Sequence, residues 1–146
     1  NMVNQSIRNN KPLSLMIMDM DHFKAVNDTY GHDMGDNVLK QLAEIIINTV
    51  RSADLAARFG GEEFVVLMPE TDRKQAMDAA ERIRKIVENA EFKLVGGEGH
   101  IKKTISIGIS FLDELGDSGQ ALLKRADEAL YKAKESGRNR VVTAEL

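Results

Sequence analysis

The feature that most constrains the fold of this chain is a pair of adjacent glycines, Gly60 and Gly61, between two runs of strand-forming residues. Glycine adopts positive φ without steric cost, so a Gly-Gly pair in this setting predicts the tip of a β-hairpin. Glu62 and Glu63 follow at once, and these like charges repel unless a cation lies between them and a substrate. A solvated polar turn explains this stretch equally well, so both interpretations stay open here.

Length and composition narrow the class of protein. The 146 residues suit one domain, and we expect 1–146 to be a single domain with its core at about 13–143, cut from a larger multidomain protein. A net charge of −3 argues against broad nucleic-acid binding. The absence of cysteine excludes disulfides and thiolate metal sites and fits a cytoplasmic location. With no apolar run of roughly 20 residues, we expect no membrane contact by this domain, although a longer parent protein could be anchored.

Hydrophobic periodicity predicts the order of helices and strands, whereas residues 1–12 carry no clear signal. We expect a buried strand at 13–18, a short helix within 19–30, a helix at 36–51 with Asp36 as its N-cap, hairpin arms at 55–59 and 64–68, a helix from Asp72 to about residue 90, a short edge strand at 92–95, a strand at 101–111 with one face of small residues, a helix at about 118–136 and a closing strand at 141–143.

This element order predicts an α/β (α+β) fold with a mixed central sheet flanked by helices. A split βαβ unit makes the first strand parallel to the first hairpin arm and leaves room for the second arm between them. The hairpin tip then lies beside the end of the first strand, which brings Asp19 to Glu62 and Glu63. The sequence therefore predicts three carboxylates at one edge of the sheet.

Carboxylates without histidine or cysteine select Mg²⁺ or Mn²⁺, and Mg²⁺ characteristically takes one or two of them together with substrate phosphates. Taken alone, Asp19 could instead cap the turn that follows it. The three histidines, His22, His32 and His100, lack the spacing of a zinc site.

Further motifs accompany this acidic group in a fixed order between residues 13 and 142. They are Asp19-Met20-Asp21-His22-Phe23-Lys24, Asn27-Asp28, Gly31-His32, Gly35-Asp36, Gly60-Gly61-Glu62-Glu63-Phe64, Thr104-Ile105-Ser106-Ile107-Gly108, Arg125-Ala126-Asp127-Glu128-Ala129-Leu130-Tyr131, Lys134 and Gly137-Arg138-Asn139. Together they resemble the GGDEF-domain diguanylate cyclases, most closely those fused to response-regulator receivers. The opening Leu-Thr-x-Leu and Asn-Arg signature of that family is absent.

The resemblance implies a nucleotidyltransferase that condenses two GTP molecules to cyclic di-GMP and releases two pyrophosphates. It also implies a mainly antiparallel sheet with a ferredoxin-like core, similar to the palm of nucleotide cyclases and polymerases. Two Mg²⁺ (or Mn²⁺) ions per active site would be held by Asp19, the backbone carbonyl of Met20 and Glu62, with Glu63 as a further ligand or base. Lys24 would act on the phosphates as part of the catalytic set.

The resemblance also assigns substrate contacts. Asn27 and Asp36 would bind the guanine edge, with His32 nearby, while Phe23 is either a pocket wall or a core residue. Lys134 and Arg138 would join Lys24 in neutralising phosphate charge. Without the resemblance, Lys134 and Arg138 are better explained as cations at a helix end.

The remaining expectations concern assembly and regulation. One GTP site per chain implies a homodimer in which each 3′-hydroxyl faces the opposite α-phosphate. Arg51 and Asp54 match the family's RxxD product-inhibition site and Arg82 its second arginine, although Arg51 and Asp54 alone suggest a helix-terminal ion pair.

The implied partners are GTP as substrate, cyclic di-GMP as product and inhibitor, and a fused sensory or receiver domain. A non-catalytic domain that binds cyclic di-GMP or GTP is the alternative, and the intact Gly-Gly-Glu-Glu-Phe motif favours the enzyme.

Overall fold

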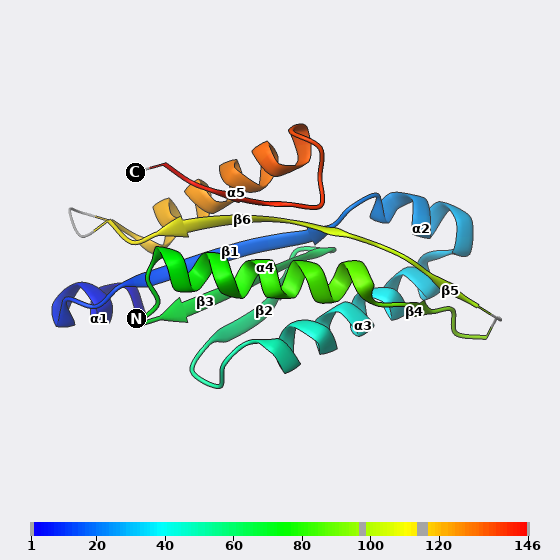
Figure 1. Cartoon of the computed structure of the whole chain (residues 1–146), viewed down its shortest axis with the longest axis horizontal. Helices are drawn as coiled ribbons and strands as arrows, with labels where there is room; N and C mark the ends of the chain where they lie inside the picture. Colours follow the sequence, from blue (N-terminus) through cyan, green and yellow to red (C-terminus); the bar gives the residue numbers. More distant parts are fainter. Residues whose placement is uncertain (1, 97–98, 114–116, 146) are drawn as a thin grey trace.

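The computed structural model describes residues 2–96, 99–113 and 117–145, and Figure 1 shows its helices and strands. In chain order they are α1 (Met2–Asn9), β1 (Leu13–Met20), α2 (Phe23–Tyr30), α3 (His32–Thr49), β2 (Leu55–Phe59), β3 (Glu63–Pro69), α4 (Arg73–Asn89), β4 (Phe92–Lys93), β5 (His100–Ile101), β6 (Ile105–Phe111), α5 (Gly119–Glu135) and β7 (Val141–Thr143). In the part of the chain described, no helix combines the length and the apolar character needed to cross a bilayer.

The central sheet has the strand order β2-β3-β1-β6-β7, and β4 and β5 form a separate ribbon. Strand β1 is antiparallel to both β3 and β6, and β2 is antiparallel to β3. Consequently β2 runs parallel to β1 with β3 between them, which confirms the split βαβ arrangement. Strands β6 and β7 are parallel, so the sheet is mixed but mainly antiparallel, as predicted.

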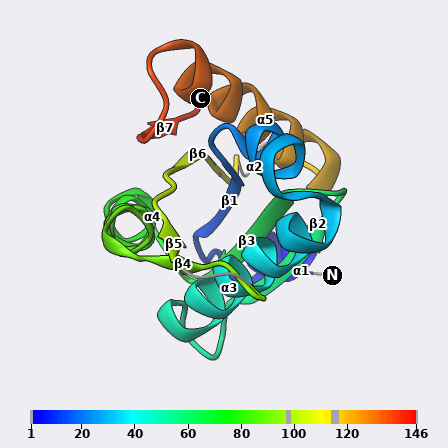
Figure 2. The ribbon, with the colours of Figure 1, turned by 90° about the vertical axis from the view of Figure 1, so that its right-hand side faces the viewer.

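Helices cover both faces of this sheet (Figure 2). Helices α3 and α4 bury one face in the larger apolar cluster, while α1 and α5 contribute Val3, Leu122, Ala126 and Leu130 to a second cluster on the other face. Every residue of β1 and β6 is buried, as expected for strands enclosed between two layers. Strands β1 and β6 are therefore the most enclosed part of the sheet.

Helix α5 approaches β6 closely because Gly108 has no side chain. A Cβ atom there would lie 2.2 Å from the backbone nitrogen of Leu130 and 2.3 Å from the carbonyl oxygen of Ala126. The predicted face of small residues on this strand is confirmed. The contact determines how closely α5 lies over the sheet.

Two predicted helix boundaries are confirmed and one is wrong. Asp72 caps α4, accepting a hydrogen bond from the backbone N–H of Gln75 in a capping box, and α5 ends before Gly137. Asp36, in contrast, is not an N-cap, because α3 begins at His32 and its N-cap, Gly31, makes no side-chain cap bond. Gly31 also ends α2, so a single glycine with φ of 91° joins the two helices and α3 gains a turn.

Two other segments differ from the sequence-based prediction. Residues 2–9 form α1, where we saw no signal, because Val3 is buried in the same apolar cluster as the strand residues Leu13 and Leu15. The strand predicted at 101–111 is interrupted, because β5 pairs with β4 whereas β6 pairs with β1 and β7. The edge strand predicted at 92–95 is correspondingly limited to β4.

Candidate functional site

The end of β1 and the tip of the β2–β3 hairpin lie side by side at one end of the sheet (Figure 1). Asp19 and Glu63 are paired residues of β1 and β3, and Glu62 directly precedes Glu63 at the tip. Directly paired residues project from the same face of a sheet. The register therefore places the Asp19 and Glu63 side chains on one face, with Glu62 next to them.

Positive charge at this acidic cluster comes from α5. The Nζ atom of Lys134 donates a hydrogen bond to Oδ2 of Asp19 at 2.5 Å, and the Asp19 side chain is only 6% exposed. Burial nevertheless raises the pKa of Asp19, with Lys134 opposing the rise. The pKa of Glu62 is raised by burial and by Asp19, and that of Glu63 by burial and then by Asp127 and Asp19. The cluster therefore carries more negative charge than its surroundings stabilise, and an added cation would relieve it.

The donor chemistry fits a hard divalent cation. Asp19, Glu62 and Glu63 offer carboxylate oxygens, and Met20 ends β1 with a backbone carbonyl next to Asp19. No group of three His, Cys, Asp or Glu side chains within the described ranges is gathered closely enough to bind a metal by itself. Mg²⁺ commonly takes only one or two carboxylates and completes its shell with water and phosphate oxygens, so this looser arrangement suits it.

Helices α2 and α3 form a corner that holds the residues predicted to bind guanine. Phe23 is buried at 7% exposure and belongs to the main core, so it is a core residue at the wall of this corner. A Cβ atom on Gly35 would lie 1.8 Å from Oδ1 of Asn27 and 3.1 Å from Cζ of Phe23. The missing side chain at Gly35 thus leaves the space that the Asn27 amide occupies. His32 and Asp36 are exposed on α3.

Arg58, which we did not single out in the sequence, joins this corner to the hairpin. Its Nε donates a hydrogen bond to the carbonyl oxygen of Gly61 at 2.9 Å, and its Nη2 lies 4.0 Å from Oδ1 of Asp36. The sequence offered little indication of this contact, because an arginine on a strand usually extends into solvent. Arg58 connects the tip beside Glu62 to the helix that carries Asp36.

The predicted phosphate-binding cations come from different elements. Lys24 is exposed on α2, and Arg138 is exposed in the turn between α5 and β7. Lys134 is more than a cation at a helix end, because it contacts Asp19 across 115 positions of sequence. Burial is the main influence on the pKa of Asp19, and Arg138 is among the cations that oppose its rise.

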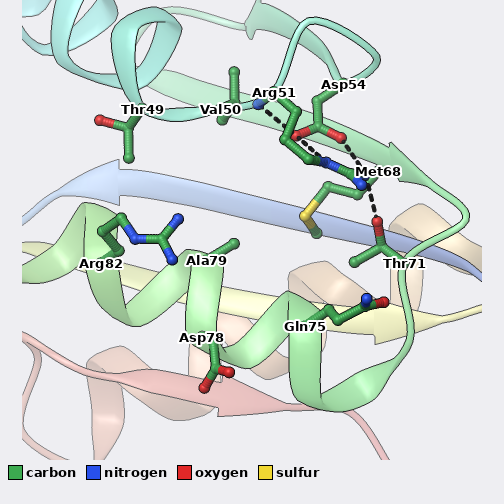
Figure 3. A pocket seen from close by; sticks show the side chains of 10 residues that line it. All are labelled: Thr49, Val50, Arg51, Asp54, Met68, Thr71, Gln75, Asp78, Ala79 and Arg82. Atoms are coloured by element: carbon green, nitrogen blue, oxygen red, sulfur yellow. Dashed lines mark hydrogen bonds and ion pairs between the residues drawn. The ribbon is translucent and has the colours of Figure 1, made fainter.

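A cavity of about 250 Å³ lies away from the acidic cluster, between the end of α3, the segment after β3 and α4 (Figure 3). The predicted residues Arg51, Asp54 and Arg82 all line it. Arg51 Nη2 donates hydrogen bonds to Asp54 Oδ1 at 2.9 Å and to Thr71 Oγ1 at 2.6 Å. The ion pair suggested as the simpler explanation is therefore present, and it forms one wall of a cavity that Arg82 faces from α4.

Asp21 is a buried carboxylate whose importance we missed in the sequence. It accepts hydrogen bonds from Thr104 Oγ1 at 2.6 Å, from Ser106 Oγ at 2.6 Å and from the backbone N–H of Asn139 at 3.0 Å. Its position two residues after Asp19 was the available signal, since alternate residues of an extended strand share a face. We had assigned this position to a helical turn.

The fold and the site together define an α+β domain with an acidic centre at one end of its sheet and a second, arginine-lined cavity. The family profile described as "Diguanylate cyclase, GGDEF domain" matches residues 1–140, and the chain belongs to this family.

Two curated relatives and two solved structures illustrate the similarity. The chain is 50% identical over 131 residues to "Response regulator PleD" of Caulobacter vibrioides and 47% identical over 139 residues to "Diguanylate cyclase A" of Treponema denticola. These matches cover 90% and 95% of this chain but 29% and 37% of the relatives, so the chain spans about a third of their length.

Among solved structures, the GGDEF domain of DgcB from Caulobacter crescentus in complex with c-di-GMP superposes with a TM-score of 0.94 at 34% identity, covering 99% of this chain and 85% of that one. The "active GGEEF domain of a diguanylate cyclase from Vibrio cholerae" gives a TM-score of 0.89 at 33% identity, covering 99% and 90%.

Proposed function

We propose that this domain is a diguanylate cyclase, which condenses two GTP molecules to cyclic di-GMP and two pyrophosphates. The observation that carries the proposal is the intact Gly60 to Phe64 motif, whose glutamates lie beside the end of β1 and the Asp19–Lys134 pair. The Vibrio cholerae domain described as active has the same GGEEF letters. In each of the two condensation steps the 3′-hydroxyl of one GTP attacks the α-phosphate of the other, and pyrophosphate leaves.

In this proposal Asp19, the Met20 carbonyl and Glu62 hold two Mg²⁺ (or Mn²⁺) ions, and Glu63 is a further ligand. Bound Mg²⁺ would polarise the α-phosphate and lower the pKa of the attacking hydroxyl. Glu63 is also suited to accept the hydroxyl proton, because burial and neighbouring carboxylates raise its pKa and make it a stronger base. The hydrogen bond from Lys134 orients the Asp19 carboxylate, and its positive charge favours the ionised form against the effect of burial.

The other predicted residues bind the nucleotide. The Asn27 amide and the Asp36 carboxylate offer complementary hydrogen-bonding groups to the edge of guanine, with His32 beside them. Arg58 connects Asp36 to the hairpin tip, which links base recognition to the phosphate site. Lys24, Lys134 and Arg138 neutralise phosphate charge, where a guanidinium grips two oxygens and an ammonium acts as a point charge.

Two copies of the chain must face each other, because the described residues of one chain form one such acidic cluster and the product contains two phosphodiester bonds. A two-fold homodimer aligns each 3′-hydroxyl with the opposite α-phosphate. A fused receiver or sensory domain would then regulate synthesis by positioning the two copies, in keeping with the relative described as a response regulator.

Incubation of the purified chain with GTP and Mg²⁺, followed by separation of the nucleotides, tests this function. We expect cyclic di-GMP and pyrophosphate to accumulate, with a rate that rises more steeply than linearly with protein concentration because two copies must meet. Tight binding of cyclic di-GMP without synthesis would identify a receptor instead, and GTP binding without any product would identify a regulatory nucleotide-binding domain. The assay is repeated on the full-length protein.

We also propose that cyclic di-GMP binds in the second cavity and inhibits synthesis. Arg51 and Arg82 line it from two elements and can each grip a phosphate, while Asp54 holds Arg51 in place. In support, the related DgcB domain was solved in complex with c-di-GMP. Arg82 is exposed and, among the described residues, has no hydrogen bond or ion pair of its own, so it is available to a ligand.

Arg82→Ala should weaken inhibition by added cyclic di-GMP by about tenfold or more, because a charge-assisted contact to phosphate is lost, while synthesis continues. The measurement is the concentration of cyclic di-GMP that halves the initial rate. Lys85→Ala is the matched control, because it removes the same charge from the exposed surface of α4 without lining the cavity. Unchanged inhibition in Arg82→Ala would remove the cavity from the regulatory proposal.

A further inference from the structure

The turn between α5 and β7 carries Arg138, and the next residue, Asn139, is held from two sides. On one side the backbone N–H of Asn139 donates to Oδ2 of the buried Asp21 at 3.0 Å. On the other side Arg84 Nη1 donates to Asn139 Oδ1 at 2.8 Å, and Asn139 Nδ2 donates to Glu88 Oε2. Asn139 thus joins the end of β1 to helix α4 across the turn.

The backbone of this turn has an unfavourable conformation that such contacts stabilise. Gly137, Arg138 and Asn139 have φ values of 132°, 63° and 45°, so three consecutive residues lie at positive φ. Glycine accepts this readily and asparagine tolerates it, but for arginine it is unfavourable. The backbone N–H of Arg138 bonds to the Ala133 carbonyl oxygen and closes α5, while the contacts of Asn139 restrain the rest of the turn.

The two sides that hold Asn139 are themselves fixed. Asp21 is buried and accepts hydrogen bonds from Thr104 and Ser106. Arg84 is ion-paired with Glu81 and keeps only 13% of its side chain exposed. A short polar side chain held between two such anchors has little freedom to move, and it restricts the residue bonded to it.

We infer that Asn139 is a positioning residue, which holds the turn so that Arg138 is presented to the substrate phosphates. The inference rests on the proposed function, in which Arg138 binds those phosphates. Asn139 itself does not touch the nucleotide. Its effect on GTP therefore passes through Arg138 and disappears when Arg138 can no longer bind phosphate.

The test variant is Asn139→Asp. Aspartate has nearly the same shape, tolerates positive φ, keeps the backbone bond to Asp21 and still accepts from Arg84. It loses the donor to Glu88 and places a second carboxylate beside it, so one of the two contacts with α4 is replaced by repulsion and the turn is pushed away from Glu88. We expect the KM for GTP, and the Kd for GTP with Mg²⁺ measured by titration calorimetry, to rise by about tenfold. Ser136→Ala is the matched control, since within the described ranges its hydroxyl bonds only to carbonyl oxygens of the last turn of α5, and it should leave both constants unchanged.

A double-mutant cycle separates positioning from a merely structural role. In an Arg138→Gln background, Asn139→Asp should change GTP binding by less than about twofold. Equal effects with and without Arg138 would overturn the inference, and so would unchanged GTP binding in Asn139→Asp. If the wild-type chain makes cyclic di-GMP while the cycle shows no coupling, only this inference fails. If the wild-type chain binds no GTP, the proposed function fails and the inference falls with it.

Discussion

Asp19→Asn should lower the rate of cyclic di-GMP synthesis by about a thousandfold while leaving the fold intact. Asparagine keeps the shape of the side chain but cannot supply the negative charge that a divalent cation needs. Among the predicted carboxylate ligands, Asp19 is the buried one, and it lies near the end of the central strand. The measurement is the initial rate of product formation, together with the midpoint of thermal unfolding.

The expectation that Asp19→Asn leaves the fold intact follows from the direction of the Asp19 pKa shift. Burial raises the pKa of Asp19 above its unfolded value, so the folded state binds its proton more tightly than the unfolded state does. The stability gained from that proton is fully present below the unfolded pKa and is lost as pH rises through the folded pKa. The ionised carboxylate therefore destabilises the fold at neutral pH, and its replacement by a neutral amide removes that cost.

The variant also loses the ion pair with Lys134. The Lys134 side chain keeps 33% of its surface exposed and can regain water, so we expect the net change in the free energy of unfolding to stay within about 1 kcal/mol. Glu44→Gln, a change of the same kind on the exposed side of α3, is the matched control for activity. Near-normal synthesis by Asp19→Asn would rule out the acidic cluster as the catalytic centre.

Gly108→Ala should destabilise the domain by about 3 kcal/mol or more, although it adds only a methyl group. The added Cβ would overlap the backbone of α5 at Leu130 and Ala126 rather than the end of a flexible side chain. The helix can relieve the overlap only by moving away from β6, which opens the second apolar cluster. Urea unfolding followed by circular dichroism measures the loss.

Gly119→Ala is the matched control for this prediction. Among the described residues, a Cβ there meets only Cγ2 of Val3, at 4.0 Å, and the residue lies in the first turn of α5. Since alanine favours helix over glycine, this variant should be as stable as the wild type or more stable by up to about 1 kcal/mol. Equal denaturation midpoints for Gly108→Ala and the wild type would show that α5 lies farther from β6 than the structure places it.

Local pattern was enough to predict much of the fold. The Gly60-Gly61 pair predicted the hairpin, the Asp72 cap predicted the start of α4, and the alternation at 101–111 predicted the face of small residues that α5 approaches closely. Each of these signals depends on residues that are neighbours in sequence or on one repeating face. The pairing of β1 with β3 then followed from the rules of chain connection and brought Asp19 to the hairpin tip.

The features that we missed depend on contacts between distant segments. Helix α1 forms because Val3 packs on the sheet, and the start of α3 is set by the glycine it shares with α2. The contacts of Asp21 with Asn139 and of Lys134 with Asp19 join residues more than 110 positions apart. Local periodicity contains no information about such distant pairs. The sequence therefore predicted the carboxylates of the acidic centre but not the polar groups that orient them.

The two arginines of the second cavity differ in how firmly their side chains are held before a ligand binds. Arg51 is already fixed by hydrogen bonds to Asp54, Thr71 and the Pro69 carbonyl oxygen. Binding of an anion to Arg51 therefore does not require its side chain to become ordered. Arg82 has no such restraint among the described residues, and its immobilisation costs up to about 2 kcal/mol of rotamer entropy. An anion bound between these two arginines would therefore meet one side chain that is already rigid, and the entropic cost of ordering would fall on Arg82 of α4.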